Sequence, residues 1–254
     1  RNNSVKNEFA GFAKFILAKN RFEFFGDLQL RTIHYKTSIV TQGDFEGADL
    51  DQNWLFFNPK AGINYKIPAG KIFVSAAIAH REPNRDDLFA NPKTEAEKLY
   101  DFEAGLEKTL GIFSFTTNLY YMNYVNQLVL NGKINDIGEF IRVNSGKSYR
   151  AGIEIGALAK LSEQWNLSGN LTLSKNENID FKNETATGIE NLGNRNISFS
   201  PESIANLLVN YRPSKDFSFG LQNQFVGSQY LDNTQNENLK LSSYFLADLN
   251  AKYT

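Results

Sequence analysis

Residues 149–175, YRAGIEIGALAKLSEQWNLSGNLTLSK, alternate between two rows of side chains along most of their length. The mostly apolar row contains Tyr149, Ala151, Ile153, Ile155, Ala157, Ala159 and Leu161, and after the polar turn at 162–164 it continues with Trp165, Leu167, Gly169, Leu171 and Leu173. The opposite row contains Arg150, Gly152, Glu154, Gly156 and Lys160, interrupted only by Leu158. A period of two is that of a β-strand, because a helix would repeat its apolar positions at intervals of three and four. The stretch therefore predicts a long β-hairpin with one apolar and one polar face.

The length of this hairpin indicates a membrane protein. Strands of soluble proteins usually have about 5–6 residues, whereas membrane-spanning strands need roughly 9–11. A long, half-polar strand is typical of a barrel whose outer face meets lipid and whose inner face meets water. Arg or Lys at the bilayer midplane on the lipid side costs roughly 2–4 kcal/mol, so we expect Arg150 and Glu154 to point inward.

Composition excludes several other classes. The chain has 254 residues, a formal net charge of −1 and no cysteine, so it shows no nucleic-acid footprint and holds no disulfide or thiolate site. No apolar run approaches the 18 or more residues of a transmembrane helix. The sequence starts at Arg1, with neither an initiator Met nor a signal peptide. We therefore expect it to be a piece of a longer protein.

The alternation recurs throughout the chain and predicts about eleven strands. They are expected at 9–17, 22–31, 54–66, 71–79, 100–107, 113–130, 138–161, 165–175, 205–211, 217–225 and 245–253. The segment 95–110 is also rich in the helix formers Glu, Ala, Lys and Leu, but alternation from Tyr100 onward favours a strand.

The connections alternate as well. Short turns are expected near 18–20, 67–70, 109–111, 162–164 and 213–216, and long polar loops at about 36–53, 80–97, 131–137, 178–200 and 232–242. This is the pattern of an outer-membrane barrel, with tight periplasmic turns and long outer loops. Aromatic residues near the short turns predict an interfacial girdle; they are Tyr65, Trp165, Tyr211, Phe217 and Tyr253. The alternative is a soluble antiparallel sandwich, whose strands also alternate.

Four segments carry a further signal: SAAIAHREPNRDDL at 75–88, YDFEAGLE at 100–107, NLYYMNYVNQL at 118–128 and RVNSGKSYRAGIE at 142–154. Together they resemble the C-terminal barrel of TonB-dependent outer-membrane receptors, especially those of Bacteroidetes-type bacteria. The resemblance implies a barrel of about 22 strands with an N-terminal plug, energised by TonB from the inner membrane. Residues 1–254 would then be a partial barrel that lacks the plug, the TonB box and the final strands. The implied partners are the TonB complex, outer-membrane lipid and a small nutrient ligand.

Two groups of residues are candidate contacts in such a receptor. In the family the charged segment after residue 80 opens an outer loop, so its residues could touch ligand or form salt bridges to neighbouring strands; they are Arg81, Arg85, Asp86 and Asp87. Other charged residues are expected to face the lumen, where they either contact the plug or are simply hydrated; they are Asp101, Glu103, Glu107, Arg150 and Glu154.

The sequence gives little support for a metal site or a catalytic site. His34 and His80 lie in different segments and fit loop or interface positions better than a metal site. Asp49, Asp51 and Asn53 imitate the start of a calcium loop, but Trp54 occupies the position of the required Gly, which favours a solvated acidic loop. Glu103 and Glu107 would have Cα atoms about 13 Å apart on one strand, too far for paired glycosidase acids. We therefore expect no catalytic residue, metal or cofactor.

The sequence thus predicts a receptor that imports a scarce nutrient, such as a siderophore, cobalamin or an oligosaccharide, without chemistry on it. Two alternatives stay open at this point. One is a passive outer-membrane channel without a plug, and the other is a soluble carbohydrate-binding β-sandwich.

Overall fold

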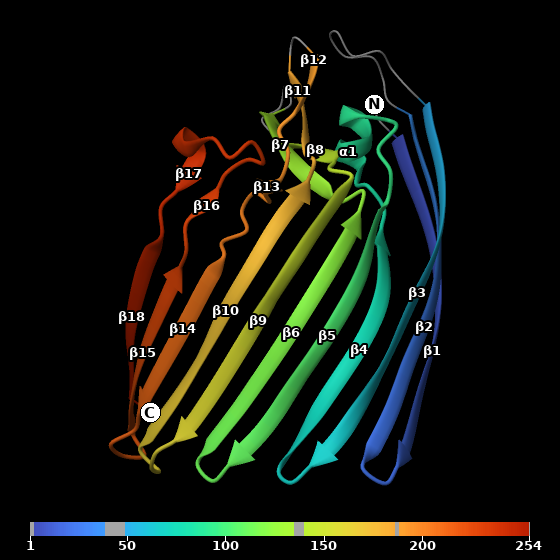
Figure 1. The fold of residues 1–254 in the computed structure, drawn as a ribbon. Coiled ribbons are helices and arrows are strands. Elements are labelled where there is room, and N and C mark those ends of the chain that lie inside the picture. Colours follow the sequence, from blue (N-terminus) through green and yellow to red (C-terminus); the bar gives the residue numbers. More distant parts are fainter. Residues whose placement is uncertain (1–2, 39–48, 135–139, 186–187, 254) are drawn as a thin grey trace.

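The main body of the protein is one curved antiparallel sheet of long strands (Figure 1). The computed structural model describes residues 3–38, 49–134, 140–185 and 188–253. Eleven strands follow one another across the sheet: β1 (Asn3–Lys19), β2 (Phe22–Ser38), β3 (Asp49–Ile67), β4 (Gly70–Arg81), β5 (Glu97–Leu110), β6 (Phe113–Val125), β9 (Lys147–Lys160), β10 (Trp165–Ile179), β14 (Ser203–Tyr211), β15 (Phe217–Val226) and β18 (Tyr244–Tyr253). One continuous sheet confirms the expected fold class and excludes a sandwich of two packed sheets.

The remaining elements gather at one end of the sheet (Figure 1). They are the hairpins β7 (Leu128–Ile134) with β8 (Phe140–Asn144), β11 (Lys182–Thr185) with β12 (Gly188–Asn191), and β16 (Gln229–Tyr230) with β17 (Lys240–Leu241), together with β13 (Arg195–Asn196), helix α1 (Arg85–Ala90) and the 3-10 turn η1 (Glu237–Leu239). Short turns close the opposite end, so the predicted alternation of short and long connections is confirmed. No described helix is long and apolar enough to cross a membrane.

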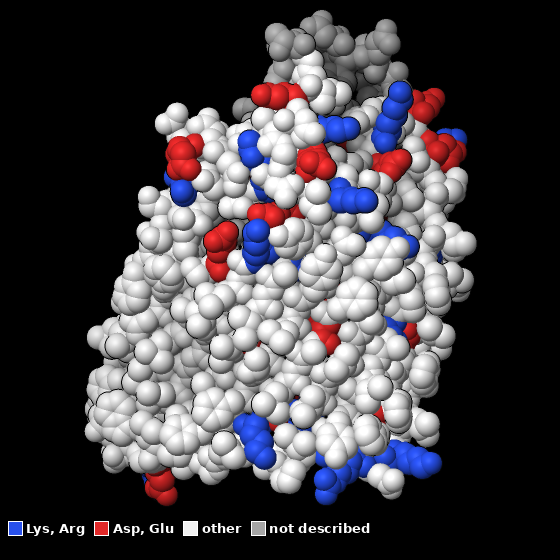
Figure 2. All heavy atoms as spheres, in the orientation of Figure 1, with Lys and Arg blue, Asp and Glu red and all other residues white. Residues whose placement is uncertain are grey.

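Strand register sorts the side chains into an apolar and a polar face. One transverse row of paired positions is apolar throughout: Phe24, Ile63, Val74, Ala104, Leu119, Ile153 and Leu173. A row one residue away lies on the other face and holds Phe25, Gly62, Ser75, Glu103, Tyr120, Gly152 and Ser174. Many large apolar side chains are exposed to solvent, including Phe102 and Leu249, and charged residues are concentrated toward the two ends of the face seen in Figure 2.

The strands are long enough to cross a bilayer and to extend beyond it. β2 has 17 residues and β3 has 19. At about 3.3 Å per residue and a tilt of about 45°, 17 residues rise about 40 Å, against a hydrocarbon core of about 30 Å. The ends of these strands therefore reach beyond the hydrocarbon core.

Aromatic side chains pack against each other between neighbouring strands near the short turns. Ring centroids of Trp165 and Tyr211 lie 4.3 Å apart, and those of Phe217 and Tyr253 lie 4.8 Å apart. Tyr65 pairs in the same way with Phe22 at 4.9 Å. All five aromatic residues predicted for the turn end thus pack in cross-strand pairs, an arrangement that suits an interfacial girdle.

Several strand boundaries differ from the prediction. The expected loop at 36–53 overlaps two strands, because β2 continues to Ser38 and β3 begins at Asp49. The expected loop at 131–137 overlaps β7, which runs to Ile134. Residues 39–48 and 135–139 lie outside the described part. The strand expected at 113–130 ends at Val125, where Asn126 takes a left-handed φ of 57°. The strand expected from Gly138 begins at Lys147, because Phe140–Asn144 pairs with β7 instead. Residues 97–110 are a strand, as alternation predicted.

Glycines on the polar face make room for aromatic side chains of the paired strand. Phe25 lies over Gly62, Phe73 over Gly105, and Tyr120 over Gly152, each at directly paired positions. A side chain at these glycines would overlap the ring and, in each case, a backbone carbonyl oxygen. These positions therefore need a residue without a Cβ for packing, not for a special backbone conformation.

We predict that Gly105→Ala destabilises the full-length protein by about 1–3 kcal/mol, because the new Cβ overlaps the Thr117 carbonyl oxygen and the Phe73 ring. Gly156→Ala is the matched control, since its Cβ would overlap only the Thr116 hydroxyl, which can rotate. Urea unfolding, followed by tryptophan fluorescence in detergent, measures both variants. Equal midpoints for the two variants would contradict the packing argument.

Candidate functional site at the loop end

Helix α1 anchors the long connection between β4 and β5 to the sheet. Leu88 is 1% exposed and packs with Tyr35 of β2 and Leu50 of β3 in a small apolar cluster that Trp54 borders. Asn84 and Asp87 form a reciprocal capping box at the helix start, with the Asp87 amide donating to Asn84 Oδ1 at 2.7 Å. Helix α1 is therefore held against the sheet by its own side chains.

The four charged residues predicted in this segment have different environments. Asp87 is 4% exposed, caps α1 and lies 3.6 Å from Arg142 of β8. Arg81 forms an ion pair with Glu97 across β4 and β5 at 2.9 Å. Arg85 and Asp86 are exposed on the first turn of the helix. Asp87 and Arg81 thus make the structural contacts that the sequence offered as an alternative to ligand binding.

A charged cluster ties this connection to the first two strands. Glu82 accepts hydrogen bonds from Lys6 at 2.8 Å and from Arg31 at 2.6 Å, and Arg31 also donates to Glu8 at 2.7 Å. Burial raises the pKa of Glu82, but the hydrogen bonds that its Oε1 accepts from Lys6 and Arg31 help to outweigh this effect, and that pKa lies below its ordinary value of 4.5. The charged form of Glu82 is therefore the form that holds the segment in place.

The five charged residues predicted to face the lumen share the polar face of the sheet. Asp101 pairs with Met122, which in turn pairs with Arg150. Glu154 pairs with Asn118 and Thr172 across its two neighbouring strands. Glu103 and Glu107 follow Asp101 on the same side of β5, and Glu107 forms an ion pair with Lys71 at 3.1 Å.

Two of these residues have distinct surroundings. Arg150 donates to Ser200 at 2.9 Å and to Asn176 at 3.3 Å, so it joins the sheet to the loop after β13. Asp101 Oδ1 and Asn118 Oδ1 are buried and have no hydrogen-bond partner among the described residues. The polar face therefore still has hydrogen-bonding capacity to offer a second surface.

The histidines and the acidic segment make local contacts. His34 pairs with Asp51 at 2.9 Å, and the His80 ring stacks on Phe56 while its Nδ1 bonds to Asn58. Asp49, Asp51 and Asn53 lie in β3, so the expected solvated loop at this position is wrong. Among the described residues, no group of three or more His, Asp or Glu side chains is arranged to hold a metal ion.

A single asparagine joins three of the long connections. Asn233 is fully buried, and its side-chain oxygen accepts from the Ser198 amide at 2.8 Å and from Asn178 at 3.1 Å. Its side-chain nitrogen donates to the Leu130 carbonyl oxygen of β7. Sequence reasoning missed this latch, because an asparagine in a polar loop carries no pattern that distinguishes it.

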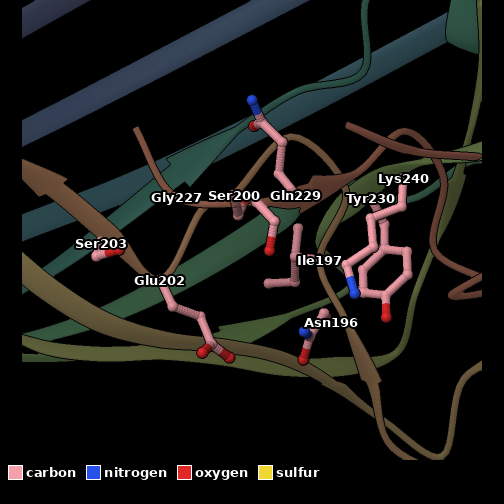
Figure 3. A pocket seen from close by; sticks show the side chains of 10 residues that line it. Asn196, Ile197, Ser200, Glu202, Ser203, Gly227, Gln229, Tyr230 and Lys240 are labelled. Carbon is pink, nitrogen blue, oxygen red and sulfur yellow. The ribbon is translucent and has the colours of Figure 1, made fainter. Parts of the chain in front are cut away.

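A polar cavity of about 240 Å³ lies where β10 changes partner from β14 to β13 (Figure 3). Its lining residues are Asn196, Ile197, Ser200, Glu202, Ser203, Gly227, Ser228, Gln229, Tyr230 and Lys240. Tyr230 and Lys240 lie close together on one side, and Asn196 and Glu202 lie on another (Figure 3). Sequence reasoning did not single out these residues, which come from separate connections.

Long strands, an apolar face, aromatic pairs near the turns and loops gathered at one end define an outer-membrane β-barrel wall. Residues 5–254 match the model of the TonB-dependent receptor-like β-barrel. The chain belongs to this family, which consists of receptors and transporters of the bacterial outer membrane and not of enzymes. The expected localisation and the absence of catalysis are thereby confirmed.

Solved structures of the same architecture come from several receptors. The siderophore receptor PiuA from Acinetobacter baumannii is 16% identical with a TM-score of 0.82, over 99% of this chain and 37% of its own. The ferric-catecholate import receptor Fiu from E. coli K12 is 18% identical with a TM-score of 0.71, over 100% and 39%. The copper transporter OprC is 17% identical with a TM-score of 0.77, over 98% and 39%. The chain thus spans less than half the length of these proteins, and no curated protein matches it.

We predict that Asn233→Ala loosens all three connections that it joins, because the Ser198 amide, the Asn178 amide and the Leu130 carbonyl lose a partner in a buried site. The expected cost is about 1–3 kcal/mol of local stability. Hydrogen exchange of 127–130, 176–181 and 196–200 in the full-length protein measures it. Asn183→Ala in β11 is the control, and faster exchange in that variant alone would contradict the latch.

We predict that the segment 82–94 loosens below about pH 4.5, because Glu82 has a lowered pKa in the folded protein. A carboxyl of this kind stabilises the fold above its unfolded pKa, and that stabilisation is lost as the pH falls through its folded pKa. Hydrogen exchange of the segment, corrected for the intrinsic effect of pH, should accelerate on acidification. In Glu82→Gln exchange should already be fast at neutral pH and change less; an identical acid response would show that other groups control the segment.

Proposed function

We infer that the chain is the barrel portion of a receptor that binds a scarce nutrient at its loop end and imports it with energy supplied through TonB. The observation that carries this proposal is the family match over residues 5–254. The structure supports it with an apolar face for lipid, an opposite polar face and a loop end held together by buried contacts. In this proposal the polar face lines the lumen.

The proposal assigns separate tasks to the separate ends of the sheet. Exposed groups at the loop end, including Arg85 and Asp86, would meet the ligand first. Asp101, Glu103, Glu107, Arg150 and Glu154 would line the path and contact a plug supplied by the rest of a longer, approximately 22-stranded receptor. The unpartnered oxygens of Asp101 and Asn118 are suited to such a contact, because buried polar atoms usually have hydrogen-bond partners.

The substrate is part of the proposal. The related structures are named for catecholate iron chelates, for siderophores and for copper. For this chain we keep siderophores, cobalamin and oligosaccharides as candidates, because the contacts that select among them lie in loops and in the plug. The likeness to receptors of Bacteroidetes-type bacteria is likewise part of the proposal.

A passive channel is the second candidate, because a lipid-facing barrel wall with a polar inner face also suits a porin. Uptake separates the two candidates. Import through the proposed receptor should stop in cells that lack TonB, whereas diffusion through a channel should continue. Iron chelates, cobalamin and oligosaccharides are offered in turn under limiting supply.

We predict that the loop end faces the cell exterior. The chain has no cysteine, so single cysteines introduced at the exposed Lys93 in the connection after α1 and at the exposed Lys215 in a short turn report each end separately. A membrane-impermeant maleimide should label Lys93→Cys in intact cells, and Lys215→Cys only after lysis. Labelling of Lys215→Cys alone in intact cells would reverse the proposed orientation.

A further inference from the structure

The cavity of Figure 3 has one wall that is fixed by contacts within the protein. Ser200 accepts from Arg150 at 2.9 Å and donates to the Ser198 carbonyl oxygen at 3.0 Å. Tyr230 donates to Glu237 at 2.6 Å, and the Lys240 ammonium bonds to the same carboxylate at 3.2 Å while lying 5.0 Å from the Tyr230 ring centroid. These contacts define the shape of the cavity before any ligand enters.

The rest of the lining carries polar groups that the protein itself does not use. Within the described part of the chain, five lining side chains have no hydrogen-bond or ion-pair partner: Asn196, Glu202, Ser203, Ser228 and Gln229. The two amides and two hydroxyls each donate and accept, and the carboxylate accepts. The cavity therefore offers a mixed set of donors and acceptors to whatever fills it.

The charges of the lining argue against an anionic ligand. Among the described residues that line the cavity Lys240 is the only cation, and Glu237 already neutralises it. Glu202 adds a carboxylate without a partner, which repels an anion. A divalent cation is also unsuited, because Ca²⁺ takes six to eight oxygen ligands and usually several carboxylates. An uncharged ligand with many hydroxyl groups fits the lining best, since each hydroxyl both donates and accepts.

The size of the cavity limits how much of a ligand it can hold. Its volume of about 240 Å³ is below the range of about 300–1,000 Å³ that is usual for drug-sized ligands. At about 30 Å³ per water it holds roughly eight waters. That space suits one ring of a larger molecule.

We propose that this cavity is a binding site for one uncharged, hydroxyl-rich ring, that is, one unit of a saccharide. Asn196, Gln229 and Glu202 contact its hydroxyls, and Ser200, Tyr230 and Lys240 hold the shape of the wall. The saccharide is either a soluble oligosaccharide or the sugar portion of a membrane glycolipid, because both present the same chemistry. The site goes beyond the proposed import function, since binding here does not require transport.

Binding to the full-length receptor in phospholipid nanodiscs tests the proposal. Maltohexaose, xylohexaose and mannohexaose are titrated calorimetrically, and ferric citrate serves as the anionic probe. A second arm measures, by native mass spectrometry, glycolipid that stays bound to the receptor extracted from outer membranes. Asn196→Ala, Gln229→Ala and Glu202→Gln are compared with Gln222→Ala, a matched control on β15 outside the cavity.

We expect at least one neutral saccharide or glycolipid to bind, and each cavity variant to weaken binding roughly three- to tenfold while Gln222→Ala leaves it unchanged. Saccharide binding without glycolipid retention identifies the soluble source, and the reverse identifies the membrane source. Absence of binding in both arms would overturn the proposal. So would binding that the cavity variants do not change, or ferric citrate binding that the same variants weaken. If the receptor imports a nutrient through TonB but binds no saccharide, the proposed saccharide site is refuted and the proposed import function is not.

Discussion

Hydrogen bonding of the backbone in the absence of water is the constraint on which this structure depends. Within a bilayer core each unsatisfied amide or carbonyl costs several kcal/mol, so a strand can cross only when neighbouring strands satisfy it. From β2 to β15 the strands of the main sheet have such a neighbour on both sides. Once the strands are paired, the period of two assigns every second residue to lipid. The apolar row through Phe24, Ile63 and Val74 is a direct result.

The same pairing limits what each face can do. On the apolar face, side chains need only be compatible with lipid, so large residues such as Phe102 and Leu249 are exposed. On the polar face, aromatic rings lie over glycines of the paired strand, and charged residues lie between them. Residues with specific partners are concentrated at the loop end, where the chain leaves the sheet and is no longer held by strand pairing alone.

Polar contacts link the long connections at the loop end to one another and to the sheet, beside small groups of buried apolar side chains such as Leu88 with Tyr35 and Leu50. Asn233 joins three connections, Glu82 joins the segment before α1 to β1 and β2, and Arg150 holds the loop after β13. Each contact links residues far apart in the sequence. The loop end therefore has a defined shape, which includes a cavity lined by polar groups that a ligand can contact.

The sequence by itself determined the strands, the two faces and the alternation of short turns with long connections, because these follow from local periodicity and turn residues. The sequence also predicted that aromatic residues lie near the short turns and that the charged residues share the polar face. Helix α1, the hairpin β7–β8, the Asn233 latch and the cavity were decided only by the tertiary structure. Their residues are polar, lie in separate connections and show no period, and only the folding of the sheet brings those connections together.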